Sequence, residues 1–285
     1  GNVAYNYGNY NPETGIGDIT DPEGNKVGEY YDDGSFVVNG ERGTWRDDAS
    51  SLHQTADGNY QYDEYGNVYD KDGNLIGHWN DDGTITDTEG NKMGEWYDDG
   101  SYIIGHFKVG DTYYGHTRGC WNENAPPLNE VEIGWGAKLY YDNHGNIFDS
   151  RGVLIGHYED GKIYNNEDKQ IGEYYDDGSY VLNGKRGTYT DDASSSQDNA
   201  SSLHQTADGN YYYDEDHNVY DKDKNLIGHW NDDGTVTDTE GNKMGEWYED
   251  GSYTLNGERG AWGDNAPALE GLPTVEHNGE TYYYD

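Results

Sequence analysis

The side chains of this 285-residue chain that could hold an ion lie in two recurring turn signals, D-x-[DE]-G-N and [NY]-D-D-G. The string from Asp70 to Asn74 (DKDGN) has the alternating oxygens of part of an EF-hand calcium loop, without that loop's first ligand or its final bidentate Glu. Acidic pairs in the second signal would give weak cation sites if they gathered along one edge of a stacked sheet. The calcium candidates are Asp70, Asp72, Asp81, Asp82, Asp98, Asp99, Asp176, Asp177, Asp232 and Asp233. Calcium is the one cofactor that the sequence suggests, and the alternative is that these strings are turns and nothing more.

A second kind of chemistry is the stacking of aromatic rings on sugar rings. The tryptophans that recur at repeat spacing, accompanied by rows of tyrosine, are Trp79, Trp96, Trp230 and Trp247. The alternative is that these rings form the core of a thin sheet, because aromatic side chains bury large areas. The sequence also contains one N-x-[ST] acceptor for glycosylation, at Asn199.

No arrangement of residues points to catalysis. Chance pairs of carboxylates are unavoidable in so acidic a chain and carry no weight. The sequence lacks a nucleophile elbow, a P-loop and an H-E-x-x-H motif. Every recurring feature is present in several copies, whereas an active site is expected once. We therefore predict that the protein is not an enzyme, and we name no catalytic residue.

Composition narrows the choice of partners. Acidic residues number 57 and basic residues 17, which gives a formal net charge of −40, so nucleic acid would be repelled. No apolar run reaches the length of a membrane span, which predicts no membrane insertion. Hydrophobic residues make up 32% of the chain, with 30 tyrosines against 3 phenylalanines. Tyr, Trp and Gly must therefore do the packing, which suits thin sheets better than a thick aliphatic core.

The stretch from Asn67 to Gly100 is a tandem repeat in which Asp87 repeats Asp70 after 17 residues. Both turn signals of each unit end in or near Gly, which readily takes positive φ, and this predicts type I turns closed by a G1 bulge. We expect Asp70 to pair with Asn74, and Asn80 with Thr84. Each unit would then contribute two β-hairpins.

Strand alternation from these pairs predicts two partly apolar sheet faces. One face would carry Tyr69, Leu75, Trp79, Ile85 and Met93. The other would carry Val68, Ile76, Trp96, Tyr102 and Ile104. Gly77 and Gly94 would lie beside large residues of neighbouring strands, where a bare backbone can accept an aromatic ring.

A longer period overlies the 17-residue unit. The motif R-G-x-[WY] begins at Arg42, Arg118, Arg186 and Arg259, which are 76, 68 and 73 residues apart. The chain therefore divides into modules of roughly seventy residues, each a run of hairpins. We predict a partial module at 1–49, repeat modules at 50–127, 128–193 and 194–269, and at 270–285 the opening strand of a further module or an inter-subunit strand.

These patterns predict an all-β fold of tandem β-hairpin repeats, arranged as an elongated meander or a solenoid-like array. The last residues match the opening strand of a module, and the first residues match the strand that follows it. We therefore expect either a window from a longer array or chains that join head to tail, the last strand of one completing the first hairpin of the next.

Short strings resemble known bacterial repeats. The strings GEWYDDGSY (94–102) and NGETYYYD (278–285) resemble the aromatic–glycine repeats of choline- and glucan-binding modules, and the YD-x-x-GN pattern at Tyr69 to Asn74 is similar to the YD repeats of large secreted shells. The resemblance implies a succession of hairpins with a role in attachment or encapsulation.

We predict a structural component of an extracellular or cell-surface filament, sheath or adhesive fibre. Its partners would be copies of itself, joined head to tail or laterally, with glycans as further partners. The alternative function is a cell-wall or glycan-binding repeat module that uses exposed Trp and Tyr.

Overall fold

The computed structural model describes residues 3–134, 136–189, 203–268 and 273–283, which consist of antiparallel strands and turns. The predicted all-β, hairpin-based fold is confirmed. Residues 1–128 with 148–154 form one compact unit, and residues 129–147 with 155–285 form another. Within the described ranges, none of the chain forms a helix with the length and apolarity of a membrane span.

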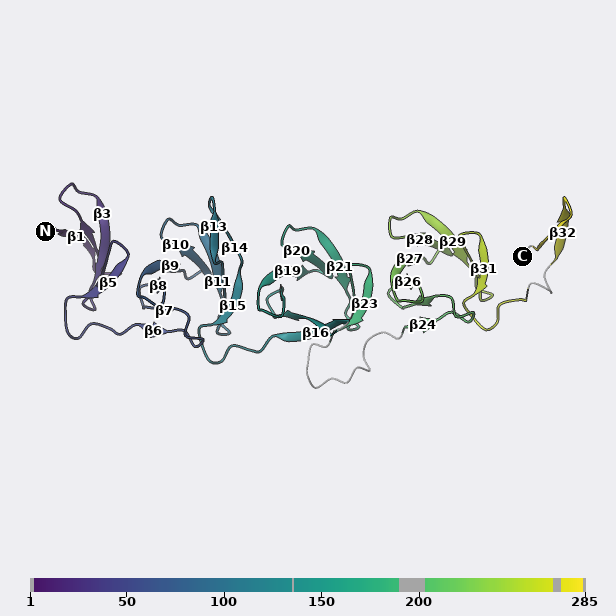
Figure 1. Ribbon diagram of the computed structural model, residues 1–285, viewed down its shortest axis with the longest axis horizontal. Helices are drawn as coiled ribbons and strands as arrows, with labels where there is room; N and C mark the ends of the chain where they lie inside the picture. Colours follow the sequence, from purple (N-terminus) through teal and green to yellow (C-terminus); the bar gives the residue numbers. More distant parts are fainter. Residues whose placement is uncertain (1–2, 135, 190–202, 269–272, 284–285) are drawn as a thin grey trace. The chain divides into compact units, whose positions relative to one another are not determined.

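The first unit holds a five-stranded sheet, an eight-stranded sheet and a separate hairpin (Figure 1). The five-stranded sheet comprises β1 (Asn6–Asn11), β2 (Ile16–Thr20), β3 (Lys26–Tyr31), β4 (Ser35–Val38) and β5 (Glu41–Thr44) in chain order. The eight-stranded sheet comprises β6 (His53–Gln54), β7 (Gln61–Tyr62), β8 (Asn67–Tyr69), β9 (Leu75–Trp79), β10 (Thr84–Asp87), β11 (Lys92–Trp96), β12 (Ser101–Ile104) and β15 (Thr117–Cys120). The hairpin between β12 and β15 comprises β13 (Phe107–Val109) and β14 (Thr112–Tyr114).

Two further eight-stranded sheets follow, each in chain order. The first comprises β16 (Asn129–Gly134), β17 (Ala137–Tyr141), β18 (Asn146–Phe148), β19 (Leu154–Glu159), β20 (Lys162–Asn165), β21 (Gln170–Tyr174), β22 (Ser179–Leu182) and β23 (Lys185–Thr188). The second comprises β24 (His204–Gln205), β25 (Tyr212–Tyr213), β26 (Asn218–Tyr220), β27 (Leu226–Trp230), β28 (Thr235–Asp238), β29 (Lys243–Trp247), β30 (Ser252–Leu255) and β31 (Glu258–Ala261). A last hairpin comprises β32 (Thr274–His277) and β33 (Glu280–Tyr283).

The turns have the predicted geometry. The Asp70 N–H donates to the Asn74 carbonyl at 2.9 Å, and the Gly73 N–H donates to the Asp70 carbonyl at 3.1 Å. Gly73 has φ 82°, the left-handed conformation that closes a G1 bulge. Asn80 and Thr84 are joined by the same backbone bond, at 2.9 Å. The pairing that sets the hairpin register was therefore readable from the turn chemistry.

The predicted division between two faces is partly wrong. Trp79 and Trp96 were placed on opposite faces, but their rings meet edge to face at 5.6 Å. Ile85 packs in the same cluster as Tyr102. Tyr69 instead lies in a separate cluster with residues of the five-stranded sheet. The physical reason is that β8–β9 and β10–β11 each contain a register shift, and an extra residue in one strand reverses the alternation beyond it.

Strand glycines allow neighbouring groups to come close to the backbone. At Gly77 and Gly94 the close neighbour is a backbone carbonyl and not the expected large side chain. A Cβ on Gly77 would overlap the backbone carbonyl of Thr86, and one on Gly94 would overlap that of Ile103. An aromatic ring over glycine is found instead at the R-G-x-[WY] motif, where a Cβ on Gly119 would overlap the ring of Tyr102. The same relation holds for Gly43 with Phe36, Gly187 with Tyr180 and Gly260 with Tyr253.

The eight-stranded sheets curl until their edge regions meet. In the sheet of β6–β12 and β15, the Asp57 N–H donates to the Cys120 carbonyl at 3.1 Å. The Asp57 carboxylate accepts from the Cys120 N–H at 3.0 Å and from the Tyr102 hydroxyl at 2.5 Å. Asp208 makes the same contacts with Ala261 and Tyr253 in the sheet of β24–β31. One carboxylate therefore ties the first hairpin of the sheet to its last.

Candidate functional site

Three turns pair with the hairpin of a preceding sheet, and the predicted calcium loop at Asp70 to Asn74 is one of them. The Leu75 N–H, directly after this loop, donates to the carbonyl of Gly40 at 2.7 Å. Asn74 forms an isolated β-bridge with Glu41. The equivalent backbone bonds are Leu154 to His116 at 2.8 Å, inside the first unit, and Leu226 to Gly184 at 2.6 Å, inside the second. We call each such region a junction.

The carboxylate of Asp70 is used to hold its own turn. One oxygen accepts from the backbone N–H groups of Asp72 and Asn74, both at 2.9 Å, and the other accepts from the Asn74 amide at 3.1 Å. Burial acts to raise the pKa of Asp70, but these hydrogen bonds outweigh it and lower the pKa. Asp72 itself is exposed. The loop is therefore built to shape and dock a turn.

The acidic pairs of the second turn signal divide their roles. The second Asp of each pair accepts from the backbone N–H and hydroxyl of a Ser or Thr two residues later, and the first Asp is exposed. The bonded second members are Asp82, Asp99, Asp177 and Asp233, of which Asp82 and Asp233 are also exposed, and the exposed first members are Asp81, Asp98, Asp176 and Asp232. In the part of the chain that is described, no three His, Cys, Asp or Glu side chains are grouped so as to hold a metal. Calcium binding stays a prediction.

Side chains complete the junction between the five-stranded sheet and the sheet of β6–β12 and β15. The buried Asn67 amide donates to the Tyr31 hydroxyl at 2.9 Å and to the Asp63 carboxylate at 2.8 Å. The same carboxylate accepts from the Tyr69 hydroxyl at 3.0 Å. The Tyr31 hydroxyl in turn donates to Glu29 at 3.1 Å. Burial, and then the charge of Glu29, raise the pKa of Tyr31, so this phenol keeps its proton throughout the ordinary pH range.

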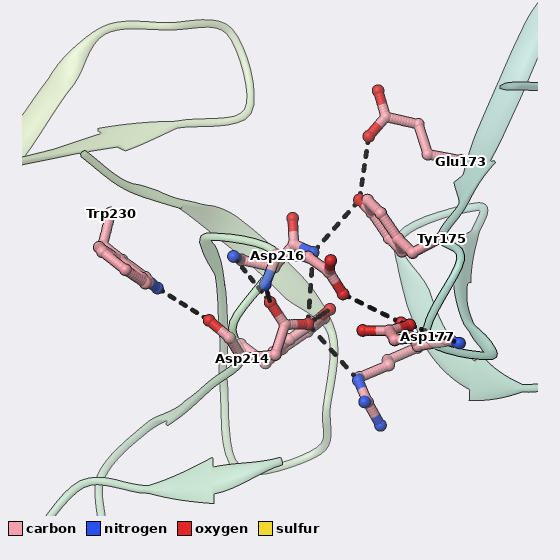
Figure 2. A network of polar contacts seen from close by, with 10 residues as sticks. Glu173, Tyr175, Asp177, Asp214, Asp216 and Trp230 are labelled. Atoms are coloured by element: carbon pink, nitrogen blue, oxygen red, sulfur yellow. Dashed lines mark hydrogen bonds and ion pairs between the residues drawn. The ribbon is translucent and has the colours of Figure 1, made fainter. Parts of the chain in front are cut away.

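The second unit repeats this network between the sheets of β16–β23 and β24–β31 (Figure 2). Asn218 donates to the Tyr175 hydroxyl at 3.2 Å, and Tyr175 donates to Glu173 at 3.0 Å. The buried Asp214 accepts from the Tyr220 hydroxyl at 2.7 Å. Arg186 of the R-G-x-[WY] motif lies 3.5 Å from the same carboxylate. Two junctions in different units thus use equivalent residues for equivalent bonds.

The two networks differ at the position of Tyr65. In the first unit, the Tyr65 hydroxyl donates to the carboxylate of Asp32 and accepts from the Asp33 N–H at 3.3 Å. Its ring stacks on Tyr31 with centroids 4.5 Å apart. The repeat places Asp216 at the equivalent position in the second unit. Burial, and then the neighbouring carboxylate of Asp177, raise the pKa of Asp216 to about 7.

The predicted stacking tryptophans form ladders on the inner side of the curled sheets. Trp96 meets Trp79 at 5.6 Å and Trp121 at 6.3 Å, edge to face in both cases. The indole N–H of Trp96 donates to the Asn80 carbonyl at 2.8 Å. The second ladder is Trp230, Trp247 and Trp262. Trp121 and Trp262 were missed as candidates, although the R-G-x-[WY] motif that contains them was visible in the sequence.

Two cavities lie against rows of aromatic rings, one against the second tryptophan ladder and one against a row of tyrosines. The sheet of β24–β31 has a cavity of about 240 Å³, lined by Trp230, Trp247 and Trp262 among other residues. The sheet of β16–β23 has one of about 610 Å³, lined there by Tyr158, Tyr174 and Tyr189. The larger cavity has tyrosines at the positions where the smaller cavity has tryptophans. The glycosylation candidate Asn199 lies outside the described residues.

Comparison with protein-family models and with curated proteins finds no match for this chain. The side-chain networks at Asn67 and at Asn218 each join two neighbouring sheets within one unit through buried, hydrogen-bonded groups, and aromatic rings line the two cavities. The resemblance to choline- and glucan-binding repeats and to YD repeats stays a prediction.

Proposed function

We propose that the protein is a structural component of an extracellular or cell-surface filament, sheath or adhesive fibre. The observation that supports this most directly is the repetition of one junction. Asn67 with Tyr31 and Asn218 with Tyr175 join different pairs of sheets by the same bond. A junction that recurs with each module lets an array grow by adding sheets, because each module needs to fit only its neighbour.

The chemistry of the junction suits a role that bears load. Its amide, phenol and carboxylate groups are buried and paired, and such groups are costly to separate because each would be left without its partner. The exposed acids of the turns give the surface a strong negative charge, which favours solubility and opposes lateral aggregation. Copies of the same chain, joined head to tail or laterally, are the proposed partners.

Electron microscopy of the full chain at micromolar concentration tests this proposal, with one sample in calcium and one in chelator. Filaments with a regular axial repeat would support a structural polymer. Filaments that dissolve in chelator would also assign a role to the exposed turn carboxylates. Single particles that stay separate at every concentration in both samples would contradict self-assembly.

A second candidate function is attachment to glycans. It is favoured by the cavity of about 240 Å³ that the Trp230, Trp247 and Trp262 rings line. The Trp247 N–H is already bonded to the Asn231 carbonyl at 2.8 Å, so a sugar would meet the rings and not this donor. Stacking of this kind needs a flat aromatic surface beside the ligand.

A glycan array with the full chain tests attachment. Saturable binding that is lost in Trp230→Ala and in Trp247→Ala would support it. Trp45→Ala is the matched control, because Trp45 occupies the R-G-x-[WY] position of the five-stranded sheet and is 53% exposed. Loss of binding in the control as well, or no binding to any glycan, would count against a specific aromatic site.

A further inference from the structure

The two side-chain junctions differ in the residue that faces the acidic turn of the preceding sheet. In the first unit, the Tyr65 hydroxyl donates a hydrogen bond to the carboxylate of Asp32. In the second unit, Asp216 replaces this tyrosine and lies facing Asp177, which is the equivalent of Asp33, whereas the equivalent of Asp32 is Asp176 (Figure 2). A phenol donates a hydrogen bond at any ordinary pH, whereas a carboxyl group donates only when it is protonated. The second junction therefore has a donor whose presence depends on pH.

Distances around Ser179 indicate where this proton is needed. The Ser179 hydroxyl lies 2.6 Å from the Asp177 carboxylate and 3.2 Å from the Asp216 carboxylate. A hydroxyl has one hydrogen, and the shorter contact to Asp177 claims it. The equivalent Ser35 gives its hydrogen to Asp33 at 2.6 Å. The single hydrogen of the Ser179 hydroxyl therefore faces two carboxylates, and a proton held by the Asp177–Asp216 pair would supply the second donor.

The charged groups around Asp216 come from both sheets. The turn before β22 supplies Asp177, and β21 supplies Glu173, which holds the Tyr175 hydroxyl at 3.0 Å. The turn before β26 supplies Asp214. The other charged or titratable neighbours are Arg186 of β23, which lies 3.5 Å from Asp214, and His217, which lies 3.8 Å from Asp232. Carboxylates outnumber cations here, so ionised Asp216 meets net repulsion from Asp177 and Asp214.

We propose that the Asp177–Asp216 carboxyl pair is a proton-operated clasp between the sheets of β16–β23 and β24–β31, closed when the pair holds a proton and weakened when it loses it. The first unit has no such clasp at the equivalent position, because Tyr65 takes the place of Asp216. One chain thus combines a junction that is insensitive to this proton with one that depends on it.

The sign of the effect follows from linkage. Asp216 has a higher pKa in the closed junction, about 7, than a free carboxyl group has. The closed state therefore holds a proton that the open state has already released, and closing becomes less favourable as pH rises between about 4 and about 7. Above about pH 7 both states are ionised and the dependence levels off.

Hydrogen exchange of the intact chain tests the clasp. The Leu226 N–H reports the second junction, and the Leu75 N–H, with the equivalent bond to Gly40, is the internal reference. Peptides that contain them are DKDKNLIGHW and DKDGNLIGHW, which differ in mass. After correction for intrinsic exchange, we expect the protection of Leu226 to fall several-fold relative to Leu75 from pH 5 to 7.5 and to level off above pH 8.

Reciprocal variants make the test specific. Asp216→Tyr copies the first junction and should remove the relative pH dependence, as should Asp216→Asn, which keeps the shape of the side chain. Tyr65→Asp should transfer the dependence to Leu75. His217→Gly, which copies Gly66, should leave the dependence at Leu226 in place and so shows that the histidine is not its source.

Two outcomes would overturn the proposal. One is parallel protection of Leu226 and Leu75 across the whole pH range in the unmodified chain. The other is a relative dependence that persists in Asp216→Asn or that disappears in His217→Gly. Neither outcome concerns filament formation, so the clasp can fail while the structural function stands, and the reverse is also true.

Discussion

The Asn67 amide donates a hydrogen bond of 2.9 Å to the hydroxyl of Tyr31, which lies 36 positions earlier in the chain. Asn67 belongs to β8 of the eight-stranded sheet, and Tyr31 to β3 of the five-stranded sheet. Both side chains are only 1% exposed. A buried amide and a buried phenol from different sheets therefore satisfy each other, so that each sheet stabilises its neighbour.

Removing this amide should destabilise the first unit. Asn67→Ala leaves the Tyr31 hydroxyl without its donor and removes a donor from the buried Asp63 carboxylate. We expect the free energy of unfolding to fall by about 2 kcal/mol. Urea denaturation followed by tryptophan fluorescence measures the change. Asn124→Ala, at an exposed position, is the control and should change stability by less than about 0.5 kcal/mol. Equal stability of the two variants would contradict the role of Asn67.

Two glycines of one hairpin should respond differently to alanine. A Cβ on Gly77 would overlap the Thr86 backbone carbonyl, which cannot move without breaking strand pairing. A Cβ on Gly73 meets open space, and only its φ of 82° is unfavourable. Lys224 occupies the equivalent turn position with φ 62°. We expect Gly73→Ala to cost about 1 kcal/mol and Gly77→Ala about 3 kcal/mol or more. Thermal melts of both variants decide, and a larger loss for Gly73→Ala would refute the close-approach argument.

Calcium should raise the thermal stability of the described turns only slightly. The Asp70 carboxylate already accepts three hydrogen bonds, so a bound cation would have to use exposed groups such as Asp72 and Asp81. Exposed carboxylates held by flexible side chains bind Ca²⁺ at about millimolar concentration or more weakly. Calorimetric melts in calcium and in magnesium at equal ionic strength should therefore nearly coincide. A calcium-specific rise in Tm that Asp72→Asn removes would instead favour a true site.

The closure of the last eight-stranded sheet should weaken in acid. Burial acts to raise the pKa of Asp208, but hydrogen bonds from Tyr253 and Thr206 outweigh it and hold the pKa at about 2. A lowered pKa stabilises the folded state above the ordinary value, and the gain is lost as pH falls from about 4 to about 2. After allowance for solvent screening, the gain is about 1 kcal/mol.

Asp208→Asn isolates this contribution. Urea unfolding of the variant and the unmodified chain between pH 2 and pH 6 should give a stability difference that shrinks toward low pH. Asp264→Asn serves as the control, since Asp264 is exposed in the segment after β31. A difference between Asp208→Asn and the unmodified chain that stays constant over the whole range would contradict the proposed linkage.

Local chemistry accounts for the part of the fold that could be predicted. The pairing of Asp70 with Asn74 depends on residues four positions apart, and the positive φ of Gly73 depends on one residue type. Such short-range preferences are legible in any sequence that repeats them. The all-β hairpin architecture and its turns were therefore determined by the sequence itself.

Tertiary structure decided what each repeated residue touches. Register shifts in β8–β9 and β10–β11 brought Trp79 and Trp96 to one face. A bulge reverses the alternation of side chains beyond it, and composition does not encode where this happens. The sequence contains many acids and did not single out Asp216, because the role of Asp216 depends on the carboxylate of Asp177, which lies 39 positions away in sequence. Sequence spacing determined the hairpins, whereas the meeting of distant turns decided which carboxylates hold a turn, which close a sheet and which share a proton.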